Sequence, residues 1–299
     1  MIRTAPALRV GAGAALISFS PVFVAVAHAG PTAVAFYRLF VGGVILAALA
    51  ALGRHALPSR RTAILAGACG LLLAADLVTW HHAIRTIGPG MATMLSNFQV
   101  LFVAAFGIAV LRERPSWRFG LGVALALAGL VLVFGADWGG AGPAYHWGVF
   151  LALVTAVLYA AFLLVLRGAQ RQARAPSPVS TLLVLSLVGA AALAVAVPLS
   201  AESFAIPDAG TAAALVGYGL VSQVLGWLLI TNGLPHVPAS RAGLLLLLQP
   251  FLAVVWDATF FGRATTGRDV LGVLTALAAI YLGSVSRGAP RREARSLTP

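Results

Sequence analysis

Ten apolar stretches, each about as long as a membrane-spanning helix, fill almost the whole of this chain. A helix needs about 20 apolar residues to cross the ~30 Å hydrocarbon core of a bilayer. Hydrophobic residues make up 60% of the chain and charged residues only 9%, so a water-soluble fold would have too little polar surface for its exterior. We therefore predict an all-α polytopic membrane protein with ten transmembrane helices, over Leu8–Ala29, Pro31–Leu52, Thr62–Thr86, Gly90–Leu111, Trp117–Gly135, Trp147–Leu166, Ser180–Leu199, Ala209–Ile230, Val237–Phe260 and Asp269–Ser286.

The distribution of arginine predicts the orientation of these helices. All 20 basic residues are Arg. With the N-terminus in the cytoplasm, 16 of the 20 lie on the cytoplasmic side, and only Arg85, Arg263 and Arg268 lie outside. Basic residues collect on the cytoplasmic side of membrane proteins. We therefore expect both termini in the cytoplasm, and we attribute the net charge of +12 to this bias rather than to a nucleic-acid partner.

The first stretch also has features of a cleaved signal peptide. Arg3 and Arg9 precede an apolar run that ends in Ala27-His28-Ala29. The run is longer than the apolar part of a signal peptide, and nine further stretches follow it. We therefore expect the first stretch to be retained as a helix.

The second half of the chain echoes the first. Trp80 of the third stretch corresponds to Trp227 of the eighth, and each is followed by a hinge containing Gly and Pro, at 87–90 and 233–238. Gln99 and Gln249 then lie at matching places, 150 positions apart. Because each half has an odd number of helices, the halves, residues 1–138 and 139–299, must have opposite orientations. Inverted repeats of this kind are typical of secondary transporters, whose substrate site lies between the repeats near the middle of the membrane.

Short motifs in both halves are shared with a known family. The motifs are Tyr37-Arg38-Leu39-Phe40, the run Ala83–Thr93, Gln99-Val100, Leu111-Arg112-Glu113-Arg114, Val237-Pro238-Ala239-Ser240-Arg241-Ala242 and Gln249-Pro250. By their order and spacing the chain resembles the EamA-type branch of the drug/metabolite transporter superfamily. The resemblance implies two five-helix repeats and export of a metabolite or an amino acid. Arg263 stands where the family pattern has an acid, so no role is carried over to that position.

Polar residues inside the apolar stretches are candidates for substrate binding or coupling, because a charge at the bilayer centre costs about 3 kcal/mol. Asp76 shares a helical face with Thr79 and Trp80. The acid could take an ammonium group or a proton, and the indole could stack on an apolar or cationic group. Arg38 could bind substrate, act in gating, or pair with Asp76 for structure alone, and these alternatives stay open.

The remaining candidates are neutral or aromatic: Gln99, Gln249, Gln223, Trp227 and Tyr159. We predict a cavity between the repeats, with the first helix bent near Pro21 and the sixth near Tyr159, lined by Asp76, Trp80, Gln99, Trp227 and Gln249. The glutamines could equally hold helices together, and glycines such as Gly67 and Gly120 are predicted close-packing positions.

Other chemistry has little support in the sequence. His81 and His82, near the outer end of the third stretch, could relay protons or lie at the interface, and both roles stay open. No His, Cys or carboxylate group has metal-ligand spacing, and no phosphate-binding loop is found. We therefore expect no metal, no cofactor and no enzymatic activity.

These observations favour a secondary transporter that exports a small metabolite, such as an amino acid or an amine-bearing compound, by alternating access with proton coupling left open. Two alternatives are an intramembrane enzyme acting on lipid-linked substrates and a non-transporting membrane scaffold. The expected partners are a small-molecule substrate and the lipid bilayer, with a homodimer left open. The Arg-, Ala- and Gly-rich composition is typical of a GC-rich bacterium and hence of the inner membrane.

Overall fold

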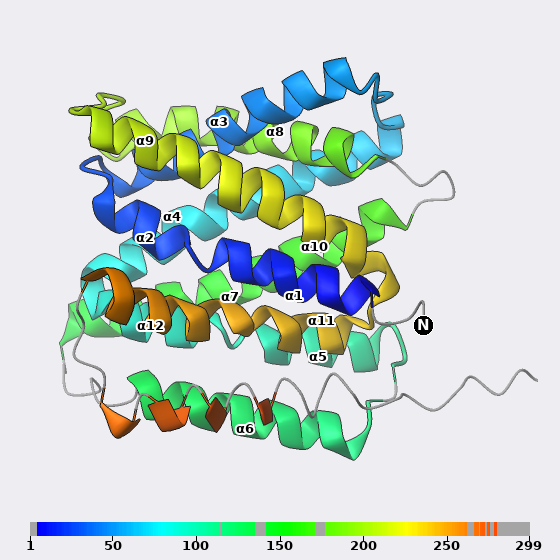
Figure 1. Ribbon diagram of the computed structural model, residues 1–299, viewed down its shortest axis with the longest axis vertical. Helices are drawn as coiled ribbons and strands as arrows, with labels where there is room; N and C mark the ends of the chain where they lie inside the picture. Colours follow the sequence, from blue (N-terminus) through cyan, green and yellow to red (C-terminus); the bar gives the residue numbers. More distant parts are fainter. Residues whose placement is uncertain are drawn as a thin grey trace, which may run out of the picture.

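The computed structural model describes residues 5–113, 115–134, 142–171 and 177–261, with short pieces between 266 and 279. Within these residues all regular structure is helical, which confirms the predicted class. Proline begins α3, α7 and α8, where its missing amide hydrogen costs nothing. The elements (Figure 1) are α1 Ala5–Ile17, α2 Ser20–Val26, α3 Pro31–Leu52, α4 Arg60–Ser96, α5 Gln99–Ala109, α6 Trp117–Phe134, α7 Pro143–Gln170, α8 Pro178–Leu199, α9 Ala209–Gly217, η2 Tyr218–Gly226, α10 Trp227–Gly233, η3 Leu234–His236, α11 Ala239–Leu246 and α12 Leu248–Phe261.

Most of the predicted spans have counterparts in the described part of the chain. Seven helical stretches there are long and apolar enough to cross a membrane: Ala5–Val26, Pro31–Leu52, Arg60–Ile87, Pro143–Gln170, Pro178–Leu199, Ala209–His236 and Ala239–Phe260. Two shorter apolar helices, Gln99–Ala109 and Trp117–Gly129, coincide with the fourth and fifth predictions. The tenth prediction, Asp269–Ser286, falls largely outside the described residues.

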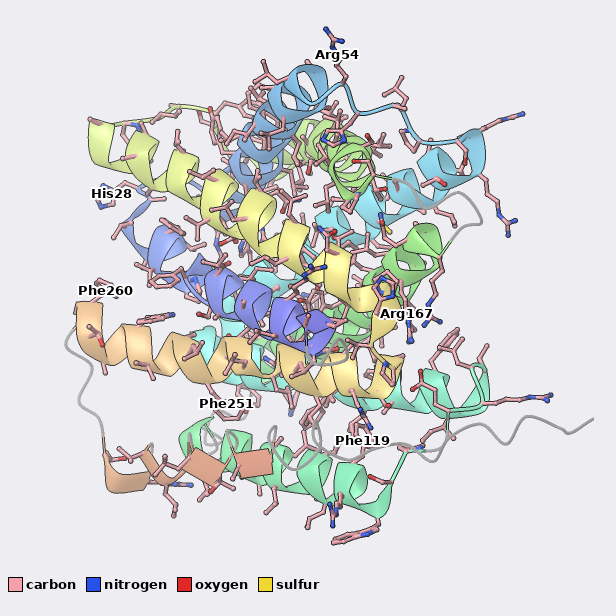
Figure 2. All side chains as sticks on the ribbon, turned by 45° about the vertical axis from the view of Figure 1, so that its right-hand side comes forward. His28, Arg54, Phe119, Arg167, Phe251 and Phe260 are labelled. Atoms are coloured by element: carbon pink, nitrogen blue, oxygen red, sulfur yellow. The ribbon has the colours of Figure 1, made fainter. Side chains whose placement is uncertain are left out.

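The first helices of the two halves run in opposite directions. The end of α7 lies near the start of α1, and both contact the segment around η3. Arg171, directly after α7, donates to the carbonyl oxygen of Pro235 in η3, from Nε at 2.9 Å and from Nη2 at 2.6 Å. Gly233, two residues earlier, packs against Pro6 of α1. Figure 2 shows Arg167 of α7 at one end of the bundle and His28, which follows α2, at the other. The two repeats are therefore inverted, as predicted.

Three of the spans are interrupted near their middle. The first is interrupted at Ser18 and Phe19, close to the predicted bend at Pro21. The fourth is interrupted at Asn97 and the ninth at Leu247, 150 positions apart, so the break recurs in both halves. The sixth span has no such break near the predicted bend at Tyr159: α7 is continuous and has no proline after its first residue.

The third span ends at Ile87, next to the predicted end at Thr86, although helical backbone continues to Ser96. A straight helix would separate Asp76 from Ser96 by about 30 Å. Both residues nevertheless line one cavity, and so do Trp80 and Thr93. The chain must therefore reverse between Trp80 and Thr93, an interval that contains the predicted hinge at 87–90.

The eighth span contains an unpredicted nine-residue π-helix, η2. Hydrogen bonds in a π-helix join residues five apart, and such turns are frequent at functional sites. A Cβ atom on Gly219 would lie 3.1 Å from the backbone nitrogen of Gly42 in α3, and one on Gly226 would lie 3.3 Å from the carbonyl oxygen of Gly13 in α1. The π-helix is therefore packed backbone to backbone between α1 and α3.

Two of the predicted close-packing glycines, Gly67 and Gly120, do not pack closely, whereas Gly70 does. A Cβ atom on Gly70 of α4 would lie 2.4 Å from the carbonyl oxygen of Leu185 in α8. At Gly67 the nearest neighbour would be 3.9 Å away, and at Gly120 nothing would lie within 4 Å. The latter two predictions are wrong, because these glycines face side chains or open space rather than a neighbouring backbone.

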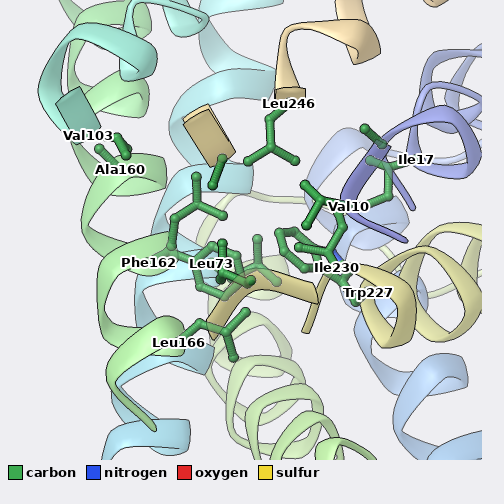
Figure 3. Close-up of a cluster of buried hydrophobic side chains, with 14 of the residues drawn as sticks. Val10, Ile17, Leu73, Val103, Ala160, Phe162, Leu166, Trp227, Ile230 and Leu246 are labelled. Atoms are coloured by element: carbon green, nitrogen blue, oxygen red, sulfur yellow. The ribbon is translucent and has the colours of Figure 1, made fainter. Parts of the chain in front are cut away.

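The larger of the two hydrophobic clusters in the described part of the chain joins the two halves. It contains residues from α1, α4, α7 and α10, including Val10, Leu73, Phe162 and Ile230. Trp227 lies edge-on to Phe162 at its centre, with ring centroids 4.8 Å apart, and Figure 3 shows these side chains together. The repeats therefore fold against each other rather than as separate units.

At one end of the bundle, a carboxylate from the first half caps a helix of the second half. Glu113 accepts hydrogen bonds from the backbone amides of Ala239 (2.7 Å) and Ser240 (3.2 Å), and from the Ser240 hydroxyl (3.0 Å). Arg167 Nη1 lies 3.3 Å from the same carboxylate. Burial opposes ionisation, but these hydrogen bonds and the charge of Arg167 outweigh it and hold the pKa of Glu113 below its usual value.

At the opposite end, the relation between the halves is reversed. Glu202, after α8, accepts from the backbone amides of Thr32 (2.9 Å) and Ala33 (3.0 Å) at the start of α3. Arg85 Nη2 lies 3.7 Å from this carboxylate. Each half therefore supplies one acid that caps the N-terminus of a helix in the other half. These two caps join the repeats at both ends of the bundle.

Candidate functional site

A cavity of about 120 Å³ lies between the two halves, at the level of the helix breaks. A volume of this size can hold several water molecules or a small solute. Its wall combines side chains from both repeats with the interrupted parts of the first, fourth and ninth spans. The lining residues are Ile17, Ser18, Ser20, Pro21, Arg38, Leu73, Asp76, Leu77, Trp80, Thr93, Ser96, Asn97, Thr155, Tyr159, Trp227, Gln249, Pro250 and Ala253.

Arg38 of α3 reaches this cavity from a buried polar network. Its Nε donates to Gln223 Oε1 at 3.2 Å, and its Nη1 donates to the Tyr218 hydroxyl at 2.9 Å. Its Cζ atom also lies 4.9 Å from the centre of the Tyr218 ring. All of these partners are neutral, so they orient the guanidinium without neutralising its charge.

Asp76 of α4 lines the same cavity and is only 7% exposed. Its Oδ1 atom has no hydrogen-bond partner in the protein. No ion pair within 4.0 Å joins Asp76 to Arg38; the ion pairs of the described residues involve other groups. A buried polar atom without a partner is costly, so this carboxyl is suited to a bound ammonium group or a proton.

Aromatic side chains form much of the remaining wall. Trp227 is 1% exposed and its indole Nε1 has no hydrogen-bond partner. Tyr159 lies edge-on to Trp227, with ring centroids 6.3 Å apart, and its hydroxyl accepts from Gln249 Nε2 at 3.2 Å. Trp80 completes the aromatic part of the wall. Such a surface suits the apolar or cationic part of a small solute.

The structure brings most of the predicted site residues to this cavity, namely Asp76, Trp80, Arg38, Tyr159, Trp227 and Gln249. Gln99 is not among the lining residues; Asn97 faces the cavity instead, and positions two apart on a helix point about 200° apart. Gln223 is fully buried behind Arg38. Thr79 lies beside the wall, 2.8 Å from the Thr155 hydroxyl.

Several site residues were missed by sequence reasoning. Thr155 lies one helical turn before Tyr159, and this i, i+4 spacing could have revealed it. Tyr218 and Ser186 carry no comparable signal, because a Tyr or Ser in an apolar helix is ordinary. Their importance comes only from contact with Arg38 and Gln223 in the folded chain.

The two histidines of α4 lie outside this wall. His81 is 2% exposed, and neither ring nitrogen has a hydrogen-bond partner. His82 Nδ1 lies 2.9 Å from the Val78 carbonyl oxygen. Among the residues that the structure describes, no three His, Cys, Asp or Glu side chains are placed to hold a metal ion.

Two inverted helical halves around a shared cavity are the architecture of a membrane transporter. The chain belongs to the EamA-like transporter family, which matches residues 7–135 and 146–285, one match in each half.

One curated relative and one solved structure are similar to this chain over most of its length. The chain is 24% identical over 266 residues to the uncharacterized transporter YwfM of Bacillus subtilis (strain 168), a match covering 89% of this chain and 87% of that protein. A protein of known crystal structure is similar to 95% of this chain and 99% of its own, with a TM-score of 0.83 at 18% identity. At that identity the likeness shows the fold.

Proposed function

We propose that this protein exports a small zwitterionic metabolite, such as an amino acid, or a related amine-bearing compound, by alternating access. One observation carries the proposal: a single cavity between the inverted halves presents the Arg38 guanidinium and the Asp76 carboxylate, which do not pair with each other. The acid group of a zwitterion would bind Arg38, and its amine would bind Asp76. Each buried charge would then gain a partner only when substrate is present.

The rest of the wall supports a compact substrate with an apolar part. Trp80, Tyr159 and Trp227 offer aromatic surface, on which an alkyl or aromatic group gains apolar contact. The volume of about 120 Å³ favours a solute of amino-acid size over a nucleotide or a sugar phosphate. Those larger anions would also require more than one cationic side chain in the cavity.

Competition at Asp76 would couple transport to protons. If this carboxyl takes either a proton or the substrate amine, then proton and substrate occupy the cavity in turn. Each outward passage of substrate is then followed by the inward passage of a proton, which is antiport. A protein that sits in the bacterial inner membrane with both termini in the cytoplasm would use the inward proton gradient to drive export.

A flux assay distinguishes this proposal from the enzyme and scaffold alternatives. Liposomes that contain the purified protein and are loaded with a mixture of amino acids and amines should release a subset of these compounds faster than protein-free liposomes loaded with the same mixture. The released compounds should have unchanged masses. A chemically altered product would favour an intramembrane enzyme. The absence of any flux across the amino-acid and amine mixture would contradict the proposal.

A further inference from the structure

The helical segment that holds Arg38 has an unusual geometry. Tyr218 and Gln223, which both accept from Arg38, are five positions apart in η2. In an α-helix such positions point about 140° away from each other. The i→i+5 hydrogen bonding of a π-helix instead brings positions five apart to nearly the same face. The π-helix therefore lets two residues of one segment accept hydrogen bonds from the same guanidinium.

The side chains that hold Arg38 are fully buried and closely packed. Tyr218, Gln223 and Ser186 are each 0% exposed, and Gln223 Nε2 donates to Ser186 Oγ at 3.0 Å. α3 packs directly against Gln223 at Gly42, one turn after Arg38: a Cβ atom on Gly42 would lie 2.8 Å from the Gln223 Cβ. The Gln223 amide is thus fixed at both ends, with its oxygen toward Arg38 and its nitrogen toward α8.

The network leaves part of the guanidinium free. Arg carries five N–H donors, and two of them are used by Tyr218 and Gln223. The other donors belong to a side chain that lines the cavity. Because no acid of the described residues pairs with Arg38 within 4.0 Å, its positive charge stays available to an anionic group there.

We propose that Tyr218, Gln223 and Ser186 are positioning residues that hold Arg38 as the binding group for the acid group of the substrate. This role rests on the proposed function, because it needs an acid-bearing substrate in the cavity. It makes the π-helix a determinant of specificity: residues that never touch the substrate decide whether an acid group is preferred.

Matched probes test this role in the full-length protein. L-Leucine, 3-methylbutylamine and 4-methylpentanoate share one side chain but carry both charged groups, the amine alone or the acid alone. L-Phenylalanine, phenethylamine and 3-phenylpropionate form a second such set. Calorimetric titration in lipid nanodiscs gives the affinity of each probe for the wild type and for Gln223→Glu, Tyr218→Phe and Ser222→Ala. The last is a control, because Ser222 lies in η2 but bonds to Ser20 rather than to Arg38.

Gln223→Glu keeps the shape of the side chain but neutralises Arg38. We expect it to weaken binding of the acid-bearing probes by about tenfold or more, with less than twofold change for the amines. Tyr218→Phe, which is almost isosteric, should give a smaller loss with the same selectivity, and Ser222→Ala should give neither.

Equal losses for acids and amines, an unchanged profile in both network variants, or an acid-specific loss in Ser222→Ala would overturn the positioning role while leaving the transport proposal intact. If no probe binds the wild type, the proposed substrate class itself fails, and the positioning role fails with it.

Discussion

Arg38 and Asp76 line one cavity from adjacent helices without forming an ion pair. Arg38 is held by Tyr218 and Gln223, and the Asp76 Oδ1 atom has no partner. Two buried opposite charges would be expected to pair if they served structure alone. Their separation within a shared cavity is therefore the relationship that favours a role in substrate binding and coupling.

Replacing Gly70 by alanine should destabilise the protein. The new Cβ atom would lie 2.4 Å from the Leu185 carbonyl oxygen, so α4 and α8 must move apart. We expect a loss of about 1–3 kcal/mol in the free energy of unfolding, measured as a lower melting temperature in detergent.

Gly67→Ala is the matched control, one turn earlier on the same helix. Its Cβ would meet only the Val188 side chain, at 3.9 Å, so the melting temperature should be unchanged or slightly raised. Similar losses in both variants would show that α4 and α8 do not pack as described.

Replacing Glu113 by glutamine should weaken the junction between the repeats. The carboxylate accepts from two backbone amides and the Ser240 hydroxyl and lies beside Arg167, and hydrogen bonds to charged groups contribute about 1.5–3 kcal/mol. We expect a lower melting temperature at pH 7.

The pH dependence follows from the lowered pKa of Glu113. Its stabilising effect is complete above the pKa of the unfolded chain, about 4.3, and is lost as the pH falls through the lower folded pKa. The difference in melting temperature between wild type and Glu113→Gln should therefore shrink as the pH falls from 5 to 3. A constant difference over that range would contradict the ionised cap.

Much of the fold could be predicted because it depends on local patterns. Apolar length gives the spans, and the matching positions of Gln99 and Gln249 give the repeat. The hinge at 87–90 indicated where the chain reverses, but the helical backbone that continues through this hinge and the π-helix could not be predicted in the same way. The sequence of η2 is ordinary for a membrane helix, and the contacts of Gly219 with α3 and of Tyr218 with Arg38 exist only in the folded chain.

The candidate site was predictable only where a residue is unusual for a membrane helix. Asp76, Arg38 and the two glutamines stand out because charged and amide groups are costly in lipid. Which of them face a common cavity depends on helix rotation, and Asn97 rather than Gln99 lines the cavity. Side chains that act through another residue, such as Ser186, have no such signal.

The orientation of the chain can be tested with reporter fusions. Fusions after Arg174 and after Arg287 should report a cytoplasmic position, and a fusion after Asp208 should report the opposite side, because 16 of the 20 arginines then lie in the cytoplasm. A fusion after Arg287 that reports the outer side would contradict an even number of spans.

The most direct test of the account is proton-driven transport by Asp76→Asn in liposomes. The wild type should accumulate an amino acid or amine against its gradient when a pH gradient is imposed. The Asn variant should bind the amino acid more weakly but, at saturating concentration, should still exchange it across the membrane without a gradient. It should not accumulate the amino acid, since the amide cannot take up a proton. Asp208→Asn, outside the cavity, should behave as the wild type. Undiminished gradient-driven accumulation by Asp76→Asn would contradict the assignment of Asp76 as the coupling residue.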